Sequence, residues 1–299
     1  MNGPLGLSKV LLVLVLCQAG CQGPPPVATQ RETAVPSYDE LIERYNDNIA
    51  PIGNLRASGM TVVYAWHDDS GDHKVQGEGR LAIVFPDRLM FRVTHISRSV
   101  PILWAGSDGQ RYWLFDFRDE RKAYYGHFAN NLRGRPNRSA LPIDLRHFPQ
   151  LLGLMPLDAV LSGPLPEVIR DQDGYMIEPP GLGARLWVSP ATYHAVRIEL
   201  LDPERQLIVS AKLTQPERLA IRGTPPGAWP YLASRIEITR PGQDKLRLRL
   251  PWDELWAKDV NPVWFNFEKL VKLYKIPEHH QIDLNFTNSS PARHAKPAS

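Results

Sequence analysis

Cysteine is nearly absent from this chain, which limits the chemistry that the folded part can use. The 299 residues contain two cysteines, Cys17 and Cys21, and both lie close to the N-terminus. The rest of the chain therefore has no disulfide and no thiolate metal site. Its stability must come from a core of buried apolar side chains, and about 280 residues are enough to build one.

An excess of one charge sign and a long apolar run are also missing. Lys plus Arg is 35 and Asp plus Glu is 32, and the two signs are interspersed along the chain. This balance argues against nucleic acid as a partner. Beyond the N-terminal region, no stretch offers the ~20 consecutive apolar residues that a transmembrane helix needs.

Catalytic and metal-binding patterns are missing as well. The sequence contains no Gly-x-Ser-x-Gly elbow and no phosphate-binding loop ending in Gly-Lys-Ser or Gly-Lys-Thr. None of the nine histidines has the spacing of a metal ligand, and the adjacent pair His279 and His280 is interpreted as an exposed turn. We therefore expect no enzymatic activity, no cofactor and no metal.

The N-terminus carries the most informative motif that is present. Lys9 and a short apolar run, Val10 to Leu16, precede Ala19-Gly20-Cys21. This layout is typical of a bacterial lipoprotein signal and predicts a mature chain that begins at a lipid-modified Cys21, with acyl chains such as palmitate. The alternative is an ordinary secretory signal cut near Ala19 or Gly20. In both cases the chain leaves the cytoplasm.

The remaining chain divides into three parts by composition. Residues 21–36 are rich in proline and predict a semi-extended tether, and residues 1–20 before them are the signal peptide. Residues 37–287 predict one folded domain. Residues 288–299 are polar and predict a disordered tail.

Helix signals are few. Ser37 to Glu40 form a capping box, and the apolar residues that follow at helical spacing predict a helix that ends at Pro51. Residues 144–154 predict a short apolar helix interrupted by Pro149. The stretch Val263–Tyr274 fits a helix or a strand.

Alternation of apolar and polar residues dominates the rest. Leu89, Phe91 and Val93 share one face of a predicted strand, and Arg88, Arg92 and Thr94 share the other. Similar runs predict strands at 56–66, 76–85, 88–94, 102–105, 110–117, 122–128, 175–178, 184–189, 195–201, 206–214, 234–240 and 245–250. Short turns between these runs indicate antiparallel pairing.

These elements predict a mainly β fold with short helices, of the α+β class. Strands with one apolar face each must bury it, so we expect a single strongly curved antiparallel sheet, a half-open barrel wrapped over helices. Aromatic residues crowd the middle hairpins; each one alone is interpreted as core. Together they suggest a cavity for an acyl chain, and the candidate lining is Leu89, Phe91, Val93, Trp104, Trp113 and Phe115.

Two segments of these hairpins resemble a known family. Phe85 to Arg92, and Ser107 to Asp116 with its Asp-Gly turn and Trp113, are similar to adjacent hairpins of the LolA/LolB lipoprotein-carrier superfamily. The later Trp264 to Phe267 and Ile282 to Leu284 resemble its closing segment. The resemblance implies a curved sheet over short helices, and a hydrophobic cavity for the acyl chains of lipoproteins. With an anchored cysteine, it implies a LolB-like member.

We therefore expect a monomeric, lipid-anchored envelope protein, placed at the outer membrane and facing the periplasm. It would bind lipid or lipoprotein acyl chains, with a role in lipoprotein sorting. The alternative is a structural or protein-interaction lipoprotein whose core is filled and which has no ligand. A large apolar cavity would distinguish the first from the second.

Overall fold

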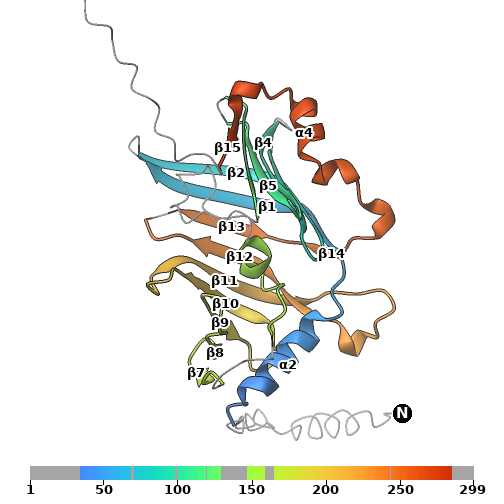
Figure 1. Ribbon diagram of the computed structural model, residues 1–299. Coiled ribbons are helices and arrows are strands. Elements are labelled where there is room, and N and C mark those ends of the chain that lie inside the picture. The colour runs from blue at the N-terminus through green and yellow to red at the C-terminus, as the bar shows by residue number, and fades with distance from the viewer. Residues whose placement is uncertain are drawn as a thin grey trace, which may run out of the picture. The chain divides into compact units, whose positions relative to one another are not determined.

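A computed structural model describes residues 34–68, 71–97, 100–118, 120–128, 147–158, 165–242 and 244–284. The predicted signal peptide, Cys21, most of the tether and the tail lie outside these ranges. The described residues from Pro36 onward belong to one compact unit. Its main element is a sheet of fifteen strands, seen in Figure 1.

All twelve predicted strands are present. They are β1 Leu55–Asp68, β2 Gly71–Val84, β3 Arg88–His95, β4 Pro101–Asp108, β5 Arg111–Asp116, β6 Lys122–His127, β8 Tyr175–Ile177, β9 Ala184–Val188, β10 Ala195–Leu201, β11 Leu207–Arg218, β12 Tyr231–Thr239 and β13 Lys245–Arg249. Three very short strands were not predicted: β7 Ile169–Arg170, β14 Trp252–Glu254 and β15 Gln281–Asp283.

The strand order is β15-β6-β5-β4-β3-β2-β1-β13-β12-β11-β10-β9-β8-β7, with β14 paired to β1. In the described part of the chain, β15 and β7 form the two edges and do not pair, so the sheet stays open. The expected antiparallel pairing holds except at one edge, where β15 runs parallel to β6. The chain reaches β15 by a long crossover, which parallel pairing requires.

Helices are short. α2, Tyr38–Ile49, begins where predicted, and the Ser37 hydroxyl accepts the N–H of Glu40 at 3.3 Å. The Glu40 carboxylate binds Arg44 at 2.9 Å instead of completing the capping box. Of the predicted helix 144–154, residues 144–146 lie outside the described ranges, and α3 covers Phe148–Leu151 of the remainder. The ambiguous late stretch is helical, with α4 at Phe267–Tyr274. The 3-10 helices are η3 Pro226–Ala228, η4 Ala257–Asp259, η5 Pro262–Phe265 and η6 Glu278–His280.

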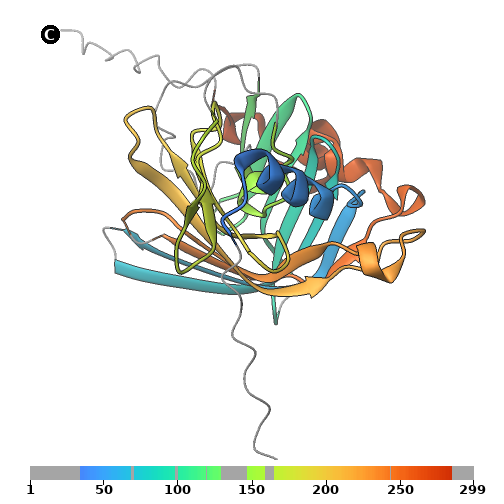
Figure 2. The ribbon, with the colours of Figure 1, turned by 90° about the horizontal axis from the view of Figure 1, so that it is seen from below.

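Both faces of the sheet carry a core. The inner face curves around α2 and α3 (Figures 1 and 2), and the larger apolar cluster lies between them. A second cluster lies on the outer face, where α4 and η5 cover β3 to β6. The expectation of one apolar face per strand is therefore wrong for the middle hairpins: Phe91 is buried on the inner face, and its neighbour Met90 is buried on the outer face.

Candidate functional site

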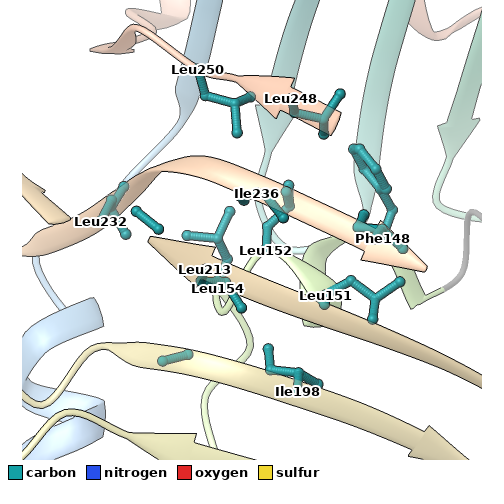
Figure 3. Packing of buried hydrophobic residues seen from close by; sticks show 14 of the residues in the cluster. Phe148, Leu151, Leu152, Leu154, Ile198, Leu213, Leu232, Ile236, Leu248 and Leu250 are labelled. Carbon is teal, nitrogen blue, oxygen red and sulfur yellow. The ribbon is translucent and has the colours of Figure 1, made fainter. Parts of the chain in front are cut away.

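The inner face of the sheet is the largest apolar surface in the fold. Strands from both halves of the sheet supply alternate side chains to it, and Figure 3 shows several from the C-terminal half together with side chains of segment 147–158. These include Ile198 of β10, Leu213 of β11, Ile236 of β12 and Leu248 of β13, all of them nearly inaccessible to solvent. The face therefore needs a cover, because so much apolar area is unstable in water.

The cover consists of α2 and of segment 147–158, and we call this segment alone the plug. The Tyr45 hydroxyl of α2 lies 3.1 Å from the carbonyl oxygens of Gly153 and Met155 and can donate to either. Asn46 donates to the Leu157 carbonyl at 2.8 Å and accepts the Leu157 N–H at 2.9 Å. Burial raises the pKa of Tyr45, which keeps its hydroxyl a donor. Polar contacts thus join the plug to α2.

The plug contacts the sheet mainly through apolar side chains. Phe148, Leu151, Leu152 and Leu154 point into the inner face (Figure 3), and the rings of Phe148 and Phe91 lie 5.4 Å apart. Within the described residues, no hydrogen bond of segment 147–158 reaches a strand. α2 makes such a contact only at its C-terminal end, where Asn48 exchanges hydrogen bonds with the backbone of Tyr231.

Gly153 allows the plug to approach the sheet closely. Its φ is +72°, a conformation that favours glycine. A Cβ atom at this position would lie 2.8 Å from the Cβ of Ala195. Both the turn after α3 and its contact with β10 therefore depend on this glycine.

Around the plug, the described side chains fill most of the inner face. A void of about 20 Å³ remains between Tyr45, Met155, Leu182, Leu186 and Ile198. This is the volume of roughly one water molecule, so an acyl chain does not fit unless side chains move. The alternative expectation, a structural lipoprotein with a filled core, describes this packing.

A larger hollow of about 540 Å³ has different chemistry. Charged side chains, among them Asp173, Arg197, Lys212 and Glu237, contribute to its lining. Arg197 is already paired with Asp173 and Glu199 at 3.2 and 2.5 Å. A site of this polarity does not suit an acyl chain.

The six predicted lining residues divide between the two faces. Leu89, Phe91 and Val93 lie on the inner face below the plug. The register pairs Arg92 with Trp104 and Trp104 with Phe115, which turns these side chains, together with Trp113, to the outer face. All six are buried. They therefore do not line one cavity, because a sheet separates the two groups.

The outer group is packed under the C-terminal segment. Phe267 of α4 lies 6.0 Å from Trp113, 5.7 Å from Phe115 and 4.9 Å from Tyr125, ring to ring. Arg92 lies over Trp104 at 5.5 Å. The indole N–H groups of Trp104 and Trp113 have no partner among the described residues. These aromatic residues are packed as part of a core, which is how the sequence is interpreted for each of them taken singly.

The sequence indicated Phe148, Leu151 and Leu152 as filling for the sheet, but it did not indicate that Tyr45 and Asn46 link α2 to the plug. Their partners are backbone groups more than 100 positions away, and no local pattern marks such contacts. Among the described residues, no helix is long and apolar enough to cross a membrane. In that same part of the chain, no group of three His, Cys, Asp or Glu side chains is placed to hold a metal ion.

His194 is a buried titratable group at the start of β10. It is 4% exposed, its Nδ1 atom lies 2.6 Å from the Thr192 hydroxyl, and its Nε2 atom has no partner in the described structure. Burial lowers the pKa of His194 from 6.5 to about 4. The imidazole is therefore neutral at neutral pH.

This burial predicts a specific pH dependence. Between pH 6.5 and about 4.5 the unfolded chain binds a proton at His194 that the folded chain does not, so the free energy of unfolding falls by about 2.5 kcal/mol. Above about pH 7.5 the group is neutral in both states and adds no slope. Urea denaturation at several pH values should show a shallower decline for His194→Gln. The exposed His147→Gln should behave as wild type; equal slopes for wild type and His194→Gln would contradict the assignment.

No family model and no curated protein matches the chain. Solved structures do. A LolA superfamily protein, NE2245 from Nitrosomonas europaea, has a TM-score of 0.44 at 11% identity, over 78% of this chain and 99% of its own. A DUF1329 family protein from Desulfovibrio piger has a TM-score of 0.46 at 10% identity, over 78% and 97%. An outer membrane lipoprotein-sorting protein domain from Vibrio parahaemolyticus has 0.43 at 11%, over 75% and 97%.

One of these structures carries the superfamily name that the sequence motifs suggested. We transfer no ligand and no residue role from them, since identity near 10% and TM-scores below 0.5 do not support that step. The fold class itself, a large open sheet with few short helices, follows from the strand pairing of this chain.

Proposed function

We propose that this chain is a lipoprotein of the bacterial envelope that binds lipid, or the acyl chains of lipoproteins, on the inner face of its sheet. The plug occupies that face when no ligand is bound. The observation that carries this proposal is the attachment of the plug: segment 147–158 is hydrogen-bonded to α2 and, in the described structure, to no strand. Among the described residues, its contacts with the face that an acyl chain would need are apolar.

The free energies of burial allow an acyl chain to take the place of the plug. Burial of an acyl chain stabilises by about 0.8 kcal/mol per CH₂ group, or about 12 kcal/mol for sixteen carbons. The large apolar side chains of the plug contribute about 2 kcal/mol each, roughly 10 kcal/mol together, and they are Phe148, Leu151, Leu152, Leu154 and Leu157. Because the two terms are similar, a ligand can replace the plug without a large net cost. The proposal contains no catalytic step.

The anchor and the location belong to the same proposal. A lipid on Cys21 would hold the domain at a membrane through the tether, and we propose the outer membrane, facing the periplasm, with the protein acting as a monomer. The support is the motif Ala19-Gly20-Cys21 after a short apolar run. On this basis the Cys21→Ser protein should move from the membrane fraction to the soluble fraction.

A structural or protein-interaction lipoprotein is the second candidate, and the small remaining void of about 20 Å³ favours it. In that case the plug is a permanent part of the core. The two candidates differ in whether the plug leaves the sheet.

Tyr45→Phe tests this difference. The substitution removes the hydroxyl that links α2 to Gly153 and Met155, and it should lower the free energy of unfolding by about 1 kcal/mol. If the plug must separate from the sheet, the variant should bind a fluorescent fatty acid several-fold faster than wild type, because the plug opens more often. Stopped-flow fluorescence measures the rate.

Tyr231→Phe is the matched control. It also removes a hydroxyl contact, the one with Arg218 at 2.7 Å, but that contact lies outside the plug. The control should bind the fatty acid at the wild-type rate. If neither wild type nor Tyr45→Phe binds the fatty acid saturably, while Tyr45→Phe is still destabilised, the permanent core is the correct description.

A further inference from the structure

The outer face of the sheet is bare where the C-terminal segment does not cover it. Figure 2 shows α2 (blue) on the inner side of β12 and β13 (orange). On the outer side, the side chains of β2, β1, β13, β12 and β11 are largely exposed. We call this surface the basic face. In the register rows from Ser58 to Ala65 of β1, its charged members are Lys74, Glu78, Arg80, Lys212, Arg235, Glu237, Lys245, Arg247 and Arg249.

Two arginines lie directly opposite each other at its centre. The register pairs Arg235 of β12 with Arg249 of β13, and threonines flank the pair: Thr214 on β11 and Thr61 on β1. Within the described chain neither guanidinium forms an ion pair. Like charges directly opposite on a sheet are destabilising, so the fold gains nothing from this arrangement.

Carboxylates do not neutralise the face. Glu237 is shared by Arg247 at 2.6 Å and Lys245 at 3.0 Å, and the Arg247 hydrogen bond is the main cause of its lowered pKa. Glu78 of β2 and Arg249 of β13 lie in the same row, but Thr61 of β1 separates them. These rows thus carry seven cations against two carboxylates, and in the described structure Lys74, Arg80, Lys212, Arg235 and Arg249 have no ion-pair partner.

We propose that the basic face docks on an anionic phospholipid surface. Guanidinium groups bind phosphate oxygens through two parallel hydrogen bonds, and adjacent arginines on a rigid sheet present several such donors to neighbouring head groups. The proposal goes beyond acyl binding and uses the opposite side of the sheet. Docking in this way leaves the plug on the side turned away from the lipid.

Vesicle flotation tests the proposal, with the Cys21→Ser chain so that an acyl anchor does not decide the result. The protein should float with vesicles of phosphatidylglycerol and phosphatidylcholine, not with phosphatidylcholine alone, and 0.5 M salt should release it (about 4 Å Debye length). Arg235→Gln/Arg249→Gln should lower the partition coefficient about tenfold or more, because each arginine near an anionic surface contributes roughly fivefold. Millimolar glycerol phosphate should not displace the protein.

Lys269→Gln/Lys272→Gln is the matched control, since it removes two exposed cations from α4, outside the basic face. It should change the partition coefficient less than threefold. Equal losses in the two double variants, or no preference for anionic vesicles, would overturn the proposal. Displacement by glycerol phosphate would identify a soluble phosphate as the ligand instead and would also overturn it. None of these results depends on whether the inner face binds a fatty acid.

Discussion

Phe91→Asp is expected to lower the free energy of unfolding by at least about 4 kcal/mol. Phe91 is 1% exposed, and it contacts Phe148 of the plug at a ring distance of 5.4 Å. The substitution removes this packing and places a carboxylate where no cation can pair with it. Urea denaturation should show a much lower midpoint. If the variant does not fold, Phe91→Leu gives a graded test, with an expected loss of about 1 kcal/mol.

Arg249→Asp is the matched control, because it introduces the same aspartate on the outer face. Arg249 is exposed and opposite Arg235, so the change should alter stability by less than about 0.5 kcal/mol and can even stabilise by removing a like-charge pair. Arg92, the outer neighbour of Phe91, is not a suitable control because its side chain lies over Trp104 and its Nε atom is buried. Similar midpoints for Phe91→Asp and Arg249→Asp would contradict the face assignment.

Most of the sheet could be predicted from the sequence because alternation is a local signal. Leu246 and Leu248 point inward while Arg247 and Arg249 point outward, as the pattern predicts. β7, β14 and β15 are only two or three residues long, too short for any period. The parallel pairing of β15 with β6 also has no local signal, since it depends on the path that the chain takes after α4.

The candidate site was harder to predict because it depends on register. Alternation groups Leu89, Phe91 and Val93 on one face of a single strand, but it does not say which face of the next strand joins them. The pairing of Trp104 with Arg92, and not with Phe91, sends the indole to the other side of the sheet. The aromatic content suggested a cavity from the sequence alone, whereas the strand pairing divides these residues between two cores, one on each face of the sheet.

This division changes which probes report a ligand. Trp104 and Trp113 lie under α4 on the outer face, so their fluorescence should respond little to an acyl chain on the inner face. An external fluorophore on the fatty acid is therefore the better reporter of binding. The same two indoles become useful reporters of the C-terminal layer instead.

Phe267→Asp should have an effect as large as that of Phe91→Asp, because α4 covers the second core. Phe267 is 5% exposed and contacts Trp113, Phe115 and Tyr125. We expect a loss of about 4 kcal/mol in the free energy of unfolding. We also expect a red shift of tryptophan emission, since water reaches Trp113 once α4 separates from β5. Both changes can be followed in one denaturation series.

Leu273→Asp is the control on the same helix. Leu273 is 61% exposed, so the same substitution buries no charge there and should cost less than about 0.5 kcal/mol with unchanged emission. If the two variants have equal midpoints and equal spectra, α4 does not stabilise the sheet and the outer aromatic cluster is held by the strands alone. A large loss for Phe267→Asp, with little change for Leu273→Asp, would establish that the C-terminal helix stabilises the sheet by covering its outer face, as the plug covers Phe91 on the inner face.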